Sequence, residues 1–125
     1  MASRSIHVDN VRSPHPIPAA CRIGPLVVSS VIRGRGPAGE RVPHAADEQL
    51  ANLFHNVGEI LRAAGADWRH MARMNFYVPD LAVREAIDRP WVEHFPDAAD
   101  RPARHTQLNA GDTDITCDFV AYVDD

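Results

Sequence analysis

The stretch RPARHTQL at residues 101–108, followed after a polar turn by ITCDFVAYV at residues 115–123, is the most informative part of this chain. In the second run, apolar residues alternate with others, which is the pattern of a strand with one buried face. Pro102 restricts the backbone ahead of the first run, so Arg104 is expected at a fixed place near the start of a strand. The two runs therefore predict the last strands of a sheet.

Two charged residues of this stretch are candidates for a binding site. The guanidinium of Arg104 is a planar fork whose geometry matches a carboxylate. Asp118 lies inside a strand that is otherwise built to be buried. An arginine that binds an acid and a carboxylate on a strand can together form a site for a small acid. The alternative is that Arg104 forms an ordinary surface ion pair.

Upstream of this stretch, the sequence predicts a strand, a loop and a helix. Residues 24–32 are mostly apolar, which predicts one buried strand, and residues 33–39 are typical of a turn-rich loop. A helix is predicted from an N-cap at Asp47 to about Ala64, because its apolar residues fall on one helical face. Gly65 is expected to end this helix.

A second strand and helix are predicted between these segments. Residues 71–78 form the strand, and the helix after it starts near Asp80 and contains Pro90, which predicts a kink or an early end. Residues 1–15 are expected to be an N-terminal arm or a short edge strand, and residues 16–125 a single domain. The order of these elements predicts an α+β fold in which two helices pack on one face of a mixed sheet.

The composition limits the partners of the chain. Its 125 residues are 45% hydrophobic and 24% charged, which is an ordinary balance for one globular domain. The net charge of −4 does not favour nucleic acid as a partner. The N-terminus lacks the apolar core of a signal peptide, and no segment is apolar enough to span a bilayer. The sequence therefore predicts a cytoplasmic protein with no membrane partner.

Residue types exclude several kinds of catalysis. All 13 basic residues are arginine, so no lysine is present for a Schiff base, for pyridoxal phosphate or for a Walker motif. The seven histidines lack the spacing of a metal site, and Cys21 and Cys117 form neither a zinc pattern nor a disulfide framework. Cys117 is expected to be a buried apolar residue. The sequence therefore predicts no metal and no cofactor.

Several motifs occur in the order found in one known family. They are LFHNV at residues 53–57, LRAAG at 61–65, FYVPDL at 76–81, Trp91 with Phe95, and PAR at 102–104. Over residues 17–123, this ordered set resembles the RidA/YjgF family of small imine and enamine deaminases. The resemblance implies a chorismate-mutase-like fold and a homotrimer, with three active sites in clefts between subunits.

The resemblance also implies roles for single residues. Arg104 stands at the arginine that binds the carboxylate of the substrate in this family. Asp118 stands where the family has a glutamate that helps to place the attacking water, and its side chain is one methylene shorter. His105 follows Arg104 directly, so on a strand it should point to the opposite face of the sheet.

Other positions of the implied substrate site depart from the family pattern. Val31 follows Ser30 where the family has a glycine, and Ile17 is the nearest match to an aromatic residue with a hydroxyl. Thr106 stands for a cysteine or serine, and Asp88 for an asparagine. These departures indicate a divergent subgroup with a different substrate.

These observations predict a hydrolytic deaminase that converts small 2-imino or enamine carboxylic acids into 2-keto acids and ammonia. One alternative is a trimer that binds carboxylates without catalysis. Another is a deaminase of a larger dicarboxylic enamine, such as an aminomuconate, with Arg33 and Arg35 reading the second carboxylate. A protein that acts on RNA is a further alternative, against which the acidic charge and the aromatic content of 6% count.

Overall fold

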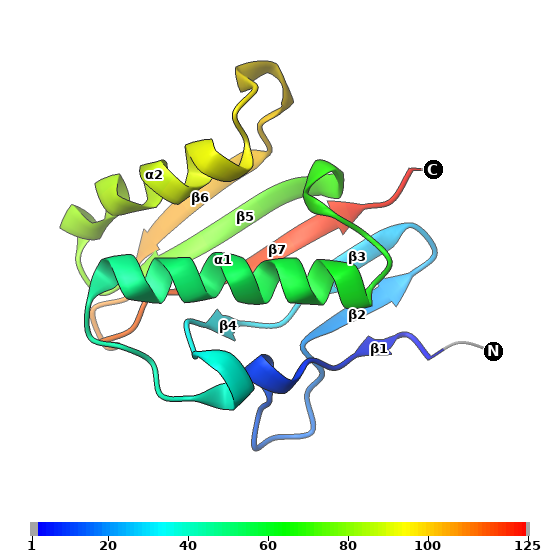
Figure 1. The fold of residues 1–125 in the computed structure, drawn as a ribbon, viewed down its shortest axis with the longest axis horizontal. Helices are drawn as coiled ribbons and strands as arrows, with labels where there is room; N and C mark the ends of the chain where they lie inside the picture. Colours follow the sequence, from blue (N-terminus) through cyan, green and yellow to red (C-terminus); the bar gives the residue numbers. More distant parts are fainter. Residues whose placement is uncertain (1–2, 125) are drawn as a thin grey trace.

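The alternating run near the C-terminus forms β7 (Thr116–Tyr122), an interior strand of a mixed sheet in the computed structural model, which describes residues 3–124 (Figure 1). β7 pairs antiparallel with β3 (Leu26–Ser29) on one side and with β5 (Met71–Val78) on the other. Its odd-numbered residues from 117 to 121 are buried in the core, as the two-residue period of a strand dictates.

The other strands complete a sheet in the order β1-β2-β3-β7-β5-β6, and β4 also pairs with β7. Their bounds are Ser5–Ile6 for β1, Ala20–Ile23 for β2, Ile32–Arg33 for β4 and Ala103–Leu108 for β6. β5 and β6 are parallel, and the other described pairs are antiparallel. Because parallel neighbours need a crossover, a helix connects β5 to β6.

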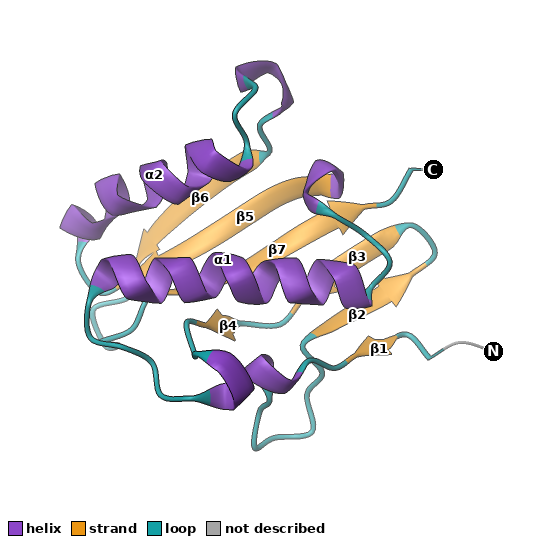
Figure 2. Cartoon of the chain, in the orientation of Figure 1, coloured by secondary structure: helices purple, strands orange, loops and turns teal. Residues whose placement is uncertain are grey.

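Two helices, α1 (Ala46–Ala63) and α2 (Arg84–His94), lie on the same face of the sheet (Figure 2). The core fills the space between them and the sheet, and α1 contributes one apolar stripe to it: Leu50, Leu53, Phe54, Val57, Ile60 and Leu61. Short 3-10 turns occupy Asp9–Val11, Pro37–Gly39, Trp68–His70, Leu81–Val83 and Ala98–Asp100. The predicted α+β fold, with two helices on one face of a mixed sheet, is confirmed.

The helix boundaries correct three predictions. Ala45 is the N-cap of α1, so the expected cap at Asp47 is wrong, and this carboxylate instead lies in the first turn, near the positive end of the helix dipole. Asp80 caps the 3-10 turn that precedes α2. α2 itself runs past Pro90 without a break, because the buried side chains of Ile87 and Trp91 hold both of its halves against the core.

The predicted strand over residues 24–32 is wrong as a single element. Residues 24–25 form a turn between β2 and β3, and Gly24 has the positive φ of 56° that this turn uses. A β-bulge then separates β3 from β4. Val28 pairs with residue 120 and Ile32 with residue 117, so the three residues 29–31 lie opposite only two residues of β7, 118 and 119. The extra residue places both Val27 and Ile32 in the core, although they are five positions apart.

The N-terminal segment joins the sheet in part. β1 lies within the expected arm and pairs with β2 at the edge of the sheet, while residues 1–2 lie outside the described part of the chain. The boundary between residues 15 and 16 stays a prediction. Within residues 3–124, none of the helices combines the length and the apolar character that crossing a membrane requires.

Candidate functional site

Arg104 lies on the edge strand β6, on the face of the sheet that the helices cover. It pairs in register with the buried Met74 of β5, and its side chain reaches α2. There it donates a hydrogen bond of 2.8 Å to Asp88 Oδ1, and the guanidinium carbon lies 5.2 Å from the ring centre of Trp91. The ring of Trp91 and the carboxylate of Asp88 thus hold the positive charge of Arg104 at the sheet edge. About a fifth of the Arg104 side chain is exposed.

Thr106 shares this face with Arg104, because it pairs with the buried Phe76 two positions along the same strands. His105 pairs with Asn75 and therefore points to the opposite face, as the sequence predicted. The structure thus brings together three predicted site residues, Arg104, Thr106 and Asp88, at the edge formed by β6 and α2.

Asp118 lies on the other face of the sheet, which no helix covers. Asn75 Nδ2 donates to its Oδ1 at 2.8 Å, and the hydroxyl of Tyr77 donates to its Oδ2 at 2.9 Å. The hydrogen bond to Asp118 raises the pKa of Tyr77, and burial raises it further. The carboxylate of Asp118 is therefore fixed by two donors from the neighbouring strand β5.

Within one chain, the structure does not bring Arg104 and Asp118 together. Arg104 pairs with Met74 of β5, whereas Asp118 pairs with the next residue, Asn75. Because consecutive residues of a strand point to opposite faces, the two charged side chains lie on opposite sides of the sheet. The expectation of a joint site can then be met only between different copies of the chain.

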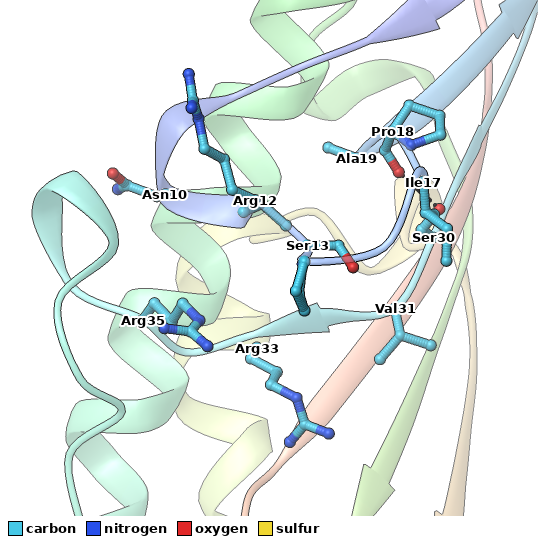
Figure 3. A pocket seen from close by; sticks show the side chains of 12 residues that line it. Asn10, Arg12, Ser13, Ile17, Pro18, Ala19, Ser30, Val31, Arg33 and Arg35 are labelled. Atoms are coloured by element: carbon cyan, nitrogen blue, oxygen red, sulfur yellow. Dashed lines mark hydrogen bonds between the residues drawn. The ribbon is translucent and has the colours of Figure 1, made fainter.

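A third group of predicted residues lines a pocket of about 570 Å³ between the N-terminal segment and the β3–β4 bulge (Figure 3). Ile17, Ser30, Val31 and Arg33 all border it. The hydroxyl of Ser30 donates to Pro18 O at 2.8 Å, which ties the bulge to the segment before β2. The bulge borders this pocket and also lies opposite residues 118 and 119 of β7. The pocket is therefore adjacent to the part of the sheet that carries Asp118.

The loop after β4 is held against α1 by side-chain amides. Asn56, which is fully buried, donates to Arg33 O at 3.1 Å and to Arg35 O at 3.0 Å. Between them, Gly34 lies so close to the backbone of Gln49 that a Cβ atom would come within 2.5 Å of the Gln49 carbonyl oxygen. Asn56 therefore has a structural role, which is to hold this loop against α1.

Two residues that contact Asp118, Asn75 and Tyr77, were not identified from the sequence, whereas Arg35, which was expected to read a second carboxylate, lines the pocket. Asn75 and Tyr77 occupy alternate positions of a strand, together with Arg73, and this polar alternation is a signal for one solvent-facing side. Cys117 is fully buried, and burial raises the pKa of its thiol far above the usual range, which agrees with its expected role as a core residue. Within residues 3–124, no group of three potential ligands could hold a metal ion.

Comparisons with known proteins show relatives in sequence and in fold. The family model described as Endoribonuclease L-PSP matches residues 12–110. Reactive Intermediate Deaminase A, a chloroplastic protein of Arabidopsis thaliana, is 32% identical over 92 residues, which are 73% of this chain and 48% of that protein. A RutC family protein of Aquifex aeolicus is 28% identical over 83 residues, 66% of each chain. The chain thus spans about half to two thirds of the curated relatives that it matches.

Solved structures share the fold at low sequence identity. RidA from an Antarctic Psychrobacter species superposes with a TM-score of 0.85 at 20% identity, covering 95% of this chain and 98% of that chain. An endoribonuclease candidate from Thermotoga maritima gives a TM-score of 0.87 at 19% identity, covering 99% and 100%. The whole arrangement of the sheet and the two helices is therefore shared with these proteins.

Proposed function

The chain belongs to the RidA/YjgF family, and from this premise we propose that it is a hydrolytic deaminase of small 2-imino or enamine carboxylic acids. The observation that carries the proposal is Arg104, a half-buried guanidinium at the sheet edge whose present partner, Asp88, is largely exposed. A substrate carboxylate can replace such a partner in a two-pronged ion pair. The deaminase name of the Arabidopsis relative supports the same class of reaction.

We propose further that the complete site forms between copies of the chain in a homotrimer. Arg104 with Thr106 and Asp88 forms one half of the site, and Asp118 with the bulge forms the other half on the opposite face. The face that carries Asp118 also has large exposed apolar side chains: Ile23, Leu26, Val28 and Tyr122. Packing this face against other copies would remove that apolar surface from water and bring the edge strand of a neighbour toward Asp118.

The proposed reaction needs only these side chains and water. Arg104 aligns the acid so that its carbon–nitrogen double bond faces the water molecule beside Asp118. Asp118, oriented by Tyr77 and Asn75, accepts a proton as the water oxygen bonds to the carbon. Proton transfer to the nitrogen then lets ammonia leave as the carbon–nitrogen bond breaks. One imine and one water thus give one 2-keto acid and one ammonia.

RNA is the other substrate class that the names of relatives raise. The family model and two similar structures carry the word endoribonuclease. Binding of RNA relies on phosphate neutralisation by a basic surface, and this chain has a net charge of −4. We therefore propose a carboxylic acid as the substrate in preference to RNA.

The test is ammonia release from freshly generated 2-imino acids by the wild type and by Arg104→Ala and Asp118→Asn. Each variant should lower kcat/KM by about 100-fold or more, because each removes a charge that acts on the reacting group. Arg89→Ala is the matched control, since Arg89 is an exposed arginine on α2. A wild type that binds 2-keto acids but does not exceed spontaneous hydrolysis would instead be the non-catalytic binding trimer.

A further inference from the structure

The charged residues that line the pocket beside the bulge are all positive. Three arginines, Arg12, Arg33 and Arg35, border it, and none of its lining residues is acidic (Figure 3). The rest of the lining is largely apolar or small: Val11, Pro14, Ile17, Pro18, Ala19 and Val31. Its volume of about 570 Å³ is within the range of pockets that hold small organic ligands. This combination suits a ligand with an apolar body and an acidic end.

Two of the three arginines are already neutralised. Arg33 donates to Asp112 Oδ2 at 3.1 Å and to Asp114 Oδ2 at 3.2 Å, and Figure 3 shows it extending away from the arm. Arg12 is highly exposed and pairs with Asp9, which is equally exposed. These two residues can contribute to the electrostatic potential of the pocket, but each already has a carboxylate partner.

Arg35 differs from both, because within residues 3–124 it forms no ion pair. The residue is half-buried, and among the described residues its guanidinium makes one hydrogen bond, a long one of 3.5 Å from Nη1 to Gly39 O. A partly desolvated guanidinium that lacks a carboxylate is electrostatically uncompensated. A bound anion would supply the missing charge.

The backbone of Arg35 is fixed before any ligand binds. Asn56 accepts a hydrogen bond from Asn10 at 3.1 Å while it bonds Arg35 O, so α1, the loop and the N-terminal segment are tied together at one point. Asn52 adds a hydrogen bond of 3.0 Å to Gly34 O. Such preorganisation is typical of a binding site, because little conformational freedom is lost when the ligand arrives.

We propose that Arg35 binds a second carboxylate of the substrate, so that the preferred substrates are 2-imino acids with a terminal acidic group. This inference rests on the proposed function, which places the reacting carbon beside Asp118. Ser30 and Val31 form the bulge opposite Asp118 and also line the pocket, so a substrate chain that leaves the reacting carbon can pass over Val31 toward Arg35. The apolar lining accommodates its methylene groups.

The test compares two keto acids of equal length, 2-oxoglutarate and 2-oxopentanoate, which differ only in a terminal carboxylate or methyl group. Isothermal titration calorimetry gives the Kd of each for the wild type, Arg35→Gln, Arg35→Lys and Arg104→Ala. The wild type should prefer 2-oxoglutarate, and Arg35→Gln should lower that preference about tenfold, as expected for one lost charge-assisted hydrogen bond. Arg35→Lys, which keeps the charge, should retain most of the preference. Arg41→Gln, an exposed arginine near the same loop, is the control.

The outcomes separate this inference from the proposed function. If the wild type binds the keto acids but releases no ammonia from the matching imino acids, the proposed deaminase activity is overturned. The ratio of the two Kd values still decides whether Arg35 binds the second carboxylate. Loss of affinity for both keto acids in Arg104→Ala would support the proposed acid site. An Arg35→Gln variant that keeps the wild-type ratio, or a wild type that binds neither acid or shows no preference, would overturn the inference.

Discussion

At the scale of single residues, the carboxylate of Asp118 has a defined orientation because Tyr77 and Asn75 occupy one oxygen each. An aspartate is one methylene shorter than the glutamate found in this family, so it reaches less far from the strand. The two donors on β5 hold this shorter side chain in one position. Orientation of the base by neighbouring groups is a common requirement for general base catalysis.

Replacing Tyr77 by phenylalanine should reduce stability at neutral pH by about 1–2 kcal/mol and lower kcat, because Asp118 loses one donor. The raised pKa of Tyr77 means that its stabilising contribution is fully present below pH 10 and is lost as the pH rises through the folded-state pKa. Urea unfolding at pH 8 and pH 11 should therefore show that Tyr77→Phe loses less free energy of unfolding between these pH values than the wild type does. Tyr122→Phe, which alters the other tyrosine, should behave like the wild type. Equal losses of stability in all three proteins would contradict a stabilising role of the Tyr77 hydroxyl.

At the scale of elements, α1 does more than cover the sheet. Its buried amides, Gln49 and Asn56, bond backbone groups of segments that are distant in sequence, and Gln49 Oε1 accepts from Ile115 N–H at 2.8 Å just before β7. Apolar residues at these positions would pack in the same volume but would leave backbone groups without partners. One helix thus fixes both the start of β7 and the loop that carries Arg35.

Asn56→Leu should destabilise the fold by about 1–3 kcal/mol, because Arg33 O and Arg35 O lose a buried donor while the volume changes little. Chemical unfolding measures this change. The same variant should lose the preference for 2-oxoglutarate, since the loop no longer holds Arg35 in place. His55→Ala, an exposed neighbour on α1, should change stability by less than about 0.5 kcal/mol. Wild-type stability in Asn56→Leu would show that the loop is held by other contacts.

At the scale of the whole molecule, the sheet separates the two halves of the proposed site. Arg104 is on the helix-covered face at the edge strand, and Asp118 is on the uncovered face, which also carries the exposed apolar residues of β2, β3 and β7. A cyclic assembly that packs the edge of one copy against the uncovered face of the next creates the same contact at each interface. Catalysis would then depend on assembly.

Mixed assemblies of Arg104→Ala and Asp118→Asn chains should recover activity that neither variant has alone. If the two residues come from different copies, random mixing leaves about one quarter of the clefts with both native residues. Unfolding and refolding the variants together, followed by the ammonia assay, measures this recovery, and each variant refolded alone is the control. If both residues act within one chain, the mixture would stay inactive.

The sequence was sufficient to predict where the two helices fall between the strands, the apolar face of α1, and the alternation that turns His105 away from Arg104. Periodicity and local residue types carry that information, since each depends on neighbours within a few positions. The likeness of its motifs to the RidA/YjgF family also identified Arg104 and Asp118, whose roles stay predictions. The β2–β3 turn was missed although its Gly24-Pro25 pair is a local turn signal. The bulge after β3 and the passage of α2 through Pro90 were missed because tertiary packing overrides the local signal there.

Which charged residues share a face could not be read from local patterns, because it depends on how the whole chain packs. A difference of one residue in register, with Arg104 opposite Met74 and Asp118 opposite Asn75, places the two on opposite sides of the sheet. Register between strands far apart in sequence is set by how the core packs, and a shift of one position reverses the face of every side chain. The same packing gives Arg33 two carboxylate partners, Asp112 and Asp114, whereas Arg35, two positions away, forms no ion pair within residues 3–124.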